Sequence, residues 1–188
     1  SDDIFDGRTV RLNGEKFNGL GISLGILRST ENWSSYIGYK HIDPNYRGDV
    51  GFVVKNDMKW LTLLQSYKMF WDLGLFKKAS FTIKKDIVYN YTNNLDVISL
   101  DGILTADLRG NSSVSYYYDY DFISNYLDKD YKNYGTSIIE FSSSPKEFIT
   151  INSNLRFGKD VAYNSDNPEL GKEFLIFFST RFQINNNF

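Results

Sequence analysis

The chain has 188 residues, a formal net charge of −2 at pH 7 and no cysteine. This length suits one domain, and the interspersed acids and bases exclude a basic groove for nucleic acid. The lack of cysteine excludes disulfides, thiolate metal sites and cysteine nucleophiles. Because aromatic residues make up 17% of the chain, a composition typical of β-proteins, we expect residues 1–188 to form a single β-domain or a segment of one.

The chain starts with Ser1, Asp2 and Asp3, which carry neither the basic nor the apolar region of a secretion signal. We therefore expect any such signal to have been removed or to lie outside this sequence. No stretch approaches the roughly 20 apolar residues of a membrane-spanning helix. A helical membrane protein is excluded.

The first clear element is the segment 19–26, where hydropathy alternates with a period of two residues. This period indicates a β-strand, because successive strand side chains point to opposite faces of a sheet. One face carries Leu20, Ile22, Leu24 and Ile26, and the other carries Gly19, Gly21, Ser23 and Gly25. The small residues on the second face predict a crowded, concave side of a curved sheet.

Further segments alternate in the same way along the chain, whereas the segment 59–71 would also suit a short helix. Their apolar faces carry Phe81, Ile83, Ile87 and Tyr89; Ile98, Leu100, Leu104 and Leu108; Val114, Tyr116, Tyr118, Tyr120 and Phe122; Ile149, Ile151, Leu155 and Phe157; and Phe178, Phe182 and Ile184. A tight turn at Gly110-Asn111 predicts a hairpin between two of them. In total the pattern predicts roughly ten strands joined as a meander.

The connections differ in length. Short polar turns are expected near 29–31, 92–94, 110–111 and 142–146, and longer loops from about 121 to 131 and from 158 to 171. Short turns on one rim and longer loops on the other are usual for outer-membrane barrels.

The polar faces of these strands predict the lining of a hydrated barrel interior. The lumen-facing candidates are Lys84, Asp86, Asp101, Asp107, Arg109, Asn152, Asn154, Arg156, Arg181 and Gln183. One interpretation is that they pair with each other and plug a narrow barrel. The other is that the three arginines and two of the aspartates form a selective eyelet for a polar solute.

Tyrosine and tryptophan gather near expected strand ends, as at Trp33, Tyr36 and Tyr39. Such clusters are typical of the aromatic girdles that mark the lipid headgroup regions of a membrane barrel. The alternative is that they fill the core of a soluble barrel or sandwich. A further hypothesis concerns Tyr116, Tyr118 and Tyr120, whose rings would suit stacking on sugars.

The segment 36–53 contains the aromatic Tyr46, the acidic Asp49 and then Val50-Gly51-Phe52-Val53. It resembles the barrel region of an uncharacterised family of Gram-negative, Bacteroidetes-type surface proteins, in which a carbohydrate-binding-like N-terminal module precedes a long barrel. That family usually has an arginine shortly after the motif, where this chain has Lys55. The resemblance implies an outer-membrane location and a longer parent protein, and it supplies no catalytic residues. The ending on Phe188 resembles the assembly signal of outer-membrane barrels, although Asn186 stands where an apolar residue is expected.

Candidates for catalysis or metal binding are few. The sole histidine, His41, has Asp43 as its only nearby oxygen donor, which favours a surface residue over a metal ligand. Asp119 and Asp121 share one strand face, a spacing that would suit glycoside chemistry or calcium. Alternating acids on a solvated strand are commoner, so no enzyme activity and no cofactor are expected.

Together these patterns predict an all-β, antiparallel up-and-down meander that closes, or part-closes, into an outer-membrane β-barrel of a Gram-negative bacterium. Its expected role is that of a pore, scaffold or surface-binding component. Its partners would be outer-membrane lipid, other outer-membrane proteins or a polar solute or glycan, and not nucleic acid. The alternatives are a soluble β-barrel or sandwich that binds a lipid or glycan, and a glycan-acting enzyme.

Overall fold

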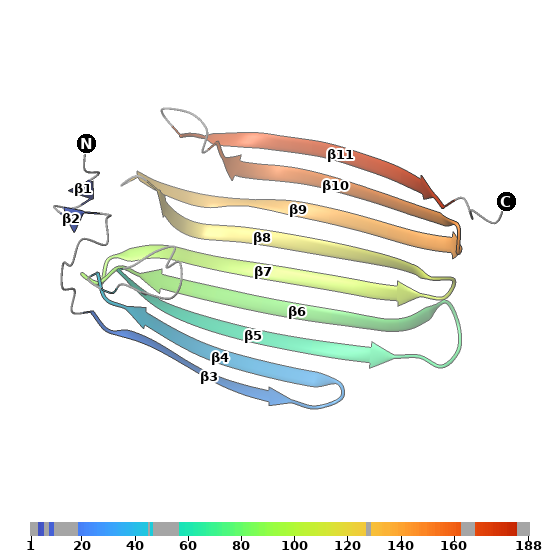
Figure 1. Ribbon diagram of the computed structural model, residues 1–188, viewed down its shortest axis with the longest axis horizontal. Coiled ribbons are helices and arrows are strands. Elements are labelled where there is room, and N and C mark those ends of the chain that lie inside the picture. Colours follow the sequence, from blue (N-terminus) through green and yellow to red (C-terminus); the bar gives the residue numbers. More distant parts are fainter. Residues whose placement is uncertain are drawn as a thin grey trace.

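The structure, a computed structural model, describes residues 19–44, 46, 57–126, 129–162 and 168–183, together with the backbone of two short strands, β1 (Ile4–Phe5) and β2 (Arg8–Thr9). These two strands pair with each other antiparallel. The other described strands form one antiparallel sheet of nine strands in sequence order, from β3 to β11 (Figure 1). The all-β, up-and-down meander is therefore confirmed.

The strands of this sheet range from 9 to 18 residues in length. They are β3 (Gly21–Ser29), β4 (Trp33–Ile42), β5 (Met58–Phe70), β6 (Phe76–Tyr89), β7 (Leu95–Leu108), β8 (Ser112–Tyr126), β9 (Lys129–Lys146), β10 (Ile149–Val161) and β11 (Leu170–Phe182). The ambiguous segment 59–71 is thus almost wholly strand β5. The hairpin at Gly110-Asn111 is confirmed as the connection between β7 and β8.

Two of the expected connections are wrong and one is too long. The turn expected at 142–146 lies within β9, and the chain turns at Glu147 and Phe148 instead. The serines before Pro145 suggested a loop, but a proline without an N–H group is tolerated close to a strand end. The loop expected from about 121 to 131 overlaps β8, which runs to Tyr126, and β9, which begins at Lys129. The loop expected at 158–171 overlaps β10, which runs to Val161, and β11, which begins at Leu170. In both places polar residues at exposed strand ends resembled a loop.

The register of the ladders divides the sheet into two faces, because directly paired residues in an antiparallel sheet lie on the same face. We call one the apolar face; it carries Ile22, Leu24, Ile26, Ile37, Leu61, Leu63, Ile83, Ile87, Leu100, Leu104, Ile139, Leu155 and Ile176. We call the other the polar face; it carries Ser23, Thr62, Ser66, Lys84, Asp86, Asp101, Asp119, Asp121, Glu140, Asn152, Asn154 and Arg156. The expected alternation within these strands is confirmed.

Gly21 and Gly25, expected on the crowded side of the first strand, lie on the polar face, and an aromatic ring faces each of them. The Tyr36 ring lies across Gly25 and Gly38, where an added Cβ would come within 2.9 and 2.4 Å of it. A side chain at either glycine would displace the ring. Tyr36 is therefore on the polar face. Trp33 and Tyr39, which belong to the same expected aromatic cluster, are on the apolar face.

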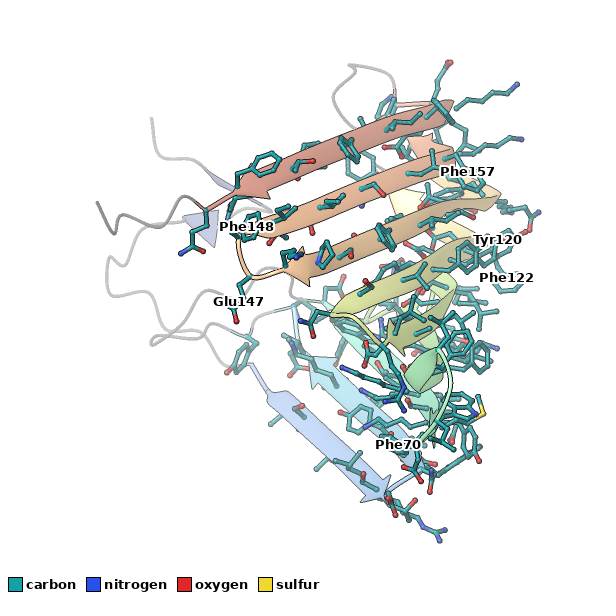
Figure 2. All side chains as sticks on the ribbon, turned by 90° about the vertical axis from the view of Figure 1, so that its right-hand side faces the viewer. Phe70, Tyr120, Phe122, Glu147, Phe148 and Phe157 are labelled. Carbon is teal, nitrogen blue, oxygen red and sulfur yellow. The ribbon has the colours of Figure 1, made fainter. Side chains whose placement is uncertain are left out.

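The described residues bury very little apolar surface. Their buried hydrophobic side chains form two small clusters, one around Ile42, Met58 and Val88 and the other around Tyr131, Tyr134 and Val161. Figure 2 shows side chains standing off the faces of a twisted and curved sheet. No helix long and apolar enough to cross a membrane occurs among the described residues.

The two edge strands, β3 and β11, have no partner on their outer edges among the described strands. Because the sheet has an odd number of antiparallel strands, both edges run in the same direction. One rim of the sheet has the short connections at 30–32, 71–75, 109–111 and 147–148. The other, which we call the long-loop rim, is where β4 is followed by β5, β6 by β7, β8 by β9 and β10 by β11, so the turn at 92–94 lies there.

Candidate functional site: the polar face of the sheet

The centre of the polar face holds a charged network around Lys84. Its Nζ lies 2.5 Å from Oδ2 of Asp86 and 3.1 Å from Oδ2 of Asp101. The Asp86 side chain is only 7% exposed, and its Oδ1 accepts hydrogen bonds from Trp60 Nε1 at 2.8 Å and Thr62 Oγ1 at 2.6 Å. A carboxylate so well supplied with donors tolerates burial.

The network continues toward β8 through further acids. Asp101 is paired directly with Asp119, and Ser99 is paired with Asp121. The carboxylates of Asp86, Asp101, Asp119 and Asp121 therefore lie in neighbouring rows of this face, with the ammonium of Lys84 among them. This region of the polar face carries a net negative charge.

A second network lies toward the β11 edge. Arg156 forms ion pairs with two acids, with Nη2 at 3.2 Å from Asp160 Oδ2 and Nε at 2.9 Å from Glu173 Oε2. Nearby, Asn154 Nδ2 donates to Glu140 Oε1 at 3.0 Å. The expected pairing of polar groups across strands is therefore present here.

Small side chains leave an open hollow on this part of the polar face. It has a volume of about 330 Å³, and Ser115, Glu140, Asn152 and Asn154 are among its lining residues. Asn152 is held by Ser142, whose Oγ donates to Asn152 Oδ1 at 2.9 Å. The hollow offers hydroxyl, amide and carboxylate groups to a polar solute.

The remaining lumen-facing candidates lie toward the rims or the edge of the sheet. Arg109 is in the β7–β8 turn, where its Nε donates to the Gly74 carbonyl at 2.7 Å and its Nη2 donates to the Asp72 carbonyl. Asp107 lies 3.8 Å from Lys78 in an exposed pair. Arg181 is exposed on edge strand β11, and Gln183 follows the end of that strand. The structure therefore separates the three arginines of the expected eyelet.

The tyrosines considered for sugar stacking lie on the apolar face. The rings of Tyr118 and Tyr120 stack with centroids 6.0 Å apart and an interplanar angle of 22°. Tyr120 also meets Phe122 edge-on at 4.8 Å, and Figure 2 shows these two side by side. Tyr116 lies on the same face two residues before Tyr118, and its hydroxyl is 3.1 Å from Ser137 Oγ.

His41 and Asp43 form a pair at the long-loop rim. His41 Nε2 lies 2.8 Å from Asp43 Oδ1, and the Leu20 N–H donates to Asp43 Oδ2 at 2.9 Å. The hydrogen bond from the Leu20 N–H holds the pKa of the Asp43 carboxyl below its ordinary value, and the contact with His41 lowers this pKa further. The described residues contain no group of three or more histidine, cysteine or acidic side chains placed to hold a metal ion.

Several residues of the networks around Lys84 and Arg156 were not predicted from the sequence. Trp60 and Thr62 lay in the segment whose type was ambiguous, Asp160 lay in the loop expected at 158–171, and Glu173 lay just after that loop. Extending the period-two patterns of the two flanking strands to positions 160 and 173 would have placed both acids on the polar face. The segment behind the family resemblance is described only up to residue 44 and at Tyr46, so 47–53 and Lys55 lie outside the described residues, as do Ile184, Asn186 and Phe188.

No protein-family model matches this chain, and no curated protein or solved structure shows significant similarity to it.

Proposed function

We propose that this chain forms the wall of an outer-membrane β-barrel of a Gram-negative bacterium. The apolar face contacts the hydrocarbon of the bilayer, and the polar face lines the interior. The protein acts without catalysis as a pore, scaffold or surface-binding component. The family resemblance of the segment 36–53 points to the same location.

One observation carries this proposal. Among the described residues, thirty-five large hydrophobic side chains are exposed and only six hydrophobic side chains are buried. A water-soluble domain of this size buries most of its large apolar side chains in a close-packed core. Leu24, Ile26 and Ile176 are 64%, 72% and 65% exposed on a continuous face, which suits contact with lipid far better than contact with water.

Strand length and the placement of aromatic rings support the same proposal. A tilted strand needs about 9 to 11 residues to cross the hydrocarbon layer, and the shortest strand of the sheet has 9. On the apolar face, Trp33 packs on Tyr67 near one rim, with ring centroids 5.9 Å apart. Tyr89, the last residue of β6, lies on the same face at the other rim. Aliphatic side chains of β5 and β6 lie between these rings, as expected between two aromatic girdles.

Lys85 is an exception, because it is exposed on the apolar face beside Leu63 and Leu100. It lies four residues from the end of β6 at the long-loop rim. A lysine at this depth buries its stem along apolar neighbours and extends its ammonium to the headgroup region. The exception is therefore compatible with a lipid-facing position.

The direction of the two open edges, β3 and β11, limits how the sheet can close into a barrel. Direct pairing of β3 with β11 would be parallel, since both strands run in the same direction. An antiparallel closure, with the even strand number usual in bacterial barrels, requires an odd number of additional strands between these edges. The unpaired backbone groups of both edges need such partners inside a bilayer.

A flotation experiment tests the proposal. The urea-denatured chain is diluted either into phosphatidylcholine vesicles or into plain buffer. We expect β-structure and flotation with the vesicles, and aggregation in buffer. Cooperative folding to a monomer in plain buffer, without vesicle association, would instead support a soluble β-protein that binds a lipid or glycan.

A further inference from the structure

Two lysines stand directly opposite one another near the long-loop rim of the sheet. Lys159 of β10 is paired with Lys172 of β11, and both side chains are exposed. Like charges at directly paired positions destabilise an antiparallel ladder. Among the described residues, neither ammonium lies within ion-pair distance of a carboxylate. The repulsion between the two ammonium groups destabilises this pairing, and a bound anion would offset the repulsion.

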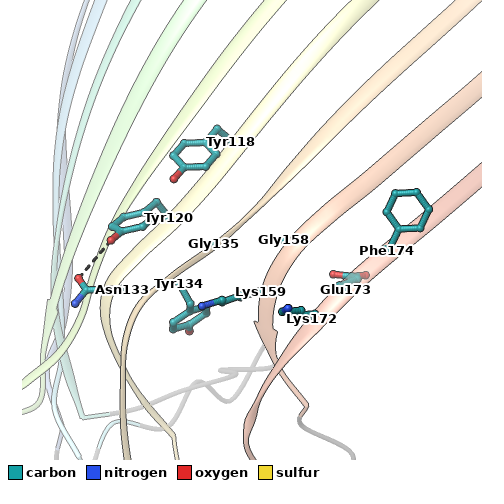
Figure 3. Close-up of a pocket in the computed structure, with 10 residues that line it drawn as sticks. All are labelled: Tyr118, Tyr120, Asn133, Tyr134, Gly135, Gly158, Lys159, Lys172, Glu173 and Phe174. Atoms are coloured by element: carbon teal, nitrogen blue, oxygen red, sulfur yellow. Dashed lines mark hydrogen bonds between the residues drawn. The ribbon is translucent and has the colours of Figure 1, made fainter.

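The two lysines line an open hollow of about 560 Å³. Tyr118 and Tyr120 line it from one side, and Phe174 lines it from the other (Figure 3). Tyr120 is fixed by its hydroxyl, which donates to Asn133 Oδ1 at 3.3 Å. The hollow therefore combines two cationic groups with aromatic walls.

Two glycines line the hollow. A Cβ on Gly135 would lie 2.2 Å from the carbonyl oxygen of Asp119, and a Cβ on Gly158 would lie 2.3 Å from the carbonyl oxygen of Gly135. The backbones of the neighbouring strands approach too closely for any side chain at these positions, so both contribute only backbone to the lining.

The one acid in the lining does not cancel the positive charge. Glu173 lines the hollow, but its carboxylate lies 2.9 Å from Arg156 Nε on the polar face. The charge available to a ligand on the apolar face is that of the two lysines.

The hollow continues into an apolar strip along β11. Phe174, Ile176 and Phe178 follow one another on the apolar face and are 71%, 65% and 66% exposed. A ligand that fits has an anionic group at the rim and a long apolar part directed toward the middle of the face. Free phosphate would leave this strip unused.

We propose that Lys159 and Lys172 bind the phosphate group of an anionic membrane lipid whose acyl chain lies along Phe174, Ile176 and Phe178. Tyr118 and Tyr120 flank the headgroup. This site rests on the proposed function, because it requires the apolar face to lie in a bilayer. Lysines near a membrane surface attract anionic lipids, and tyrosine rings suit the headgroup level.

Native mass spectrometry in a neutral detergent tests the site, with dimyristoylphosphatidylglycerol as the added lipid. We expect the double variant K159Q/K172Q to bind this lipid roughly thirtyfold more weakly than the wild type, given the contribution of about 1 kcal/mol from each lysine to such attraction. The control is K132Q, because Lys132 already lies 3.8 Å from Asp130. K132Q should bind as the wild type does.

A second variant separates lipid binding from folding. K159E places opposite charges at the paired positions and should stabilise the ladder, yet it should lose phosphatidylglycerol binding. Flotation of every variant with neutral phosphatidylcholine vesicles tests membrane insertion independently. Wild-type affinity in K159Q/K172Q or K159E would overturn the proposal, as would displacement of the lipid by inorganic phosphate at an equal concentration.

Discussion

The ammonium of Lys84 lies 2.5 Å from a carboxylate oxygen of Asp86, whose side chain is only 7% exposed. This contact joins neighbouring positions of one face of β6, and it continues across the ladder to Asp101 on β7. It offsets part of the negative charge at the centre of the polar face.

Loss of this ammonium should destabilise the sheet. Lys84→Met leaves Asp86 and Asp101 without their cation, which should cost about 2 kcal/mol because a buried carboxylate loses its partner. The measurement is the urea midpoint of the folded protein. The control is Lys78→Met, because Lys78 lies 3.8 Å from Asp107 in an exposed pair and should change stability by less than about 0.5 kcal/mol. Equal effects of the two variants would contradict the role of the network.

Glycine at position 135 should be essential for the pairing of β8 with β9. Gly135→Ala places a Cβ 2.2 Å from the Asp119 carbonyl oxygen, and relief requires a shift of the backbone that should cost at least about 2 kcal/mol. Gly102→Ala is the matched control, because its nearest atoms are 4.0 Å away. Thermal or urea unfolding compares the two variants, and similar stability in both would refute the close approach.

The neighbours Leu104 and Thr105 test which face meets lipid. Leu104, which is 50% exposed, lies on the apolar face, and Thr105 lies on the polar face. Leu104→Arg should lower the stability of the vesicle-inserted protein by about 2 kcal/mol, whereas Thr105→Arg should have a much smaller effect. In a water-soluble protein the exposed Leu104 position would accept arginine readily. Urea titration in vesicles distinguishes the cases.

Protonation of Asp43 at low pH should weaken its hydrogen bond with the Leu20 N–H. Because the folded-state pKa of Asp43 is lowered, its contribution to stability is present above the ordinary value near 3.9 and is lost as the pH falls through the lower folded value. The Leu20 N–H, which donates to this carboxylate, should then exchange faster with solvent. Amide exchange at Leu20 measures this. In Asp43→Asn the acid-induced change should disappear.

The sequence was sufficient to predict which residues share a face within a strand. Leu20 to Ile26 and Leu100 to Leu108 alternate cleanly, and a period of two allows only one division of side chains between the faces. Strand ends were harder to predict, because Ser142 to Pro145 resembled a turn in composition although they continue β9.

Contacts between strands could not be predicted in the same way. The hydrogen bond from Trp60 to Asp86 depends on the register of β5 against β6, which the 71–75 turn sets and which no pattern within either strand reveals. The contact of Tyr36 with Gly25 and Gly38 likewise depends on how the ring lies across the sheet. The polar face was therefore predictable as a set of residues, but its networks were not.

The central claim is that hydrocarbon touches the apolar face, and a fluorophore placed on β3 tests it most directly. The chain has no cysteine, so Leu24→Cys and Ser23→Cys each give a single labelling site on adjacent residues of opposite faces. With an environment-sensitive dye attached and the protein in vesicles, nitroxide-labelled acyl chains should quench the dye at position 24, and aqueous iodide should not. The dye at position 23 should escape the nitroxide. Quenching of the position 24 dye by iodide and not by nitroxide lipid would contradict the assignment of the apolar face to the membrane.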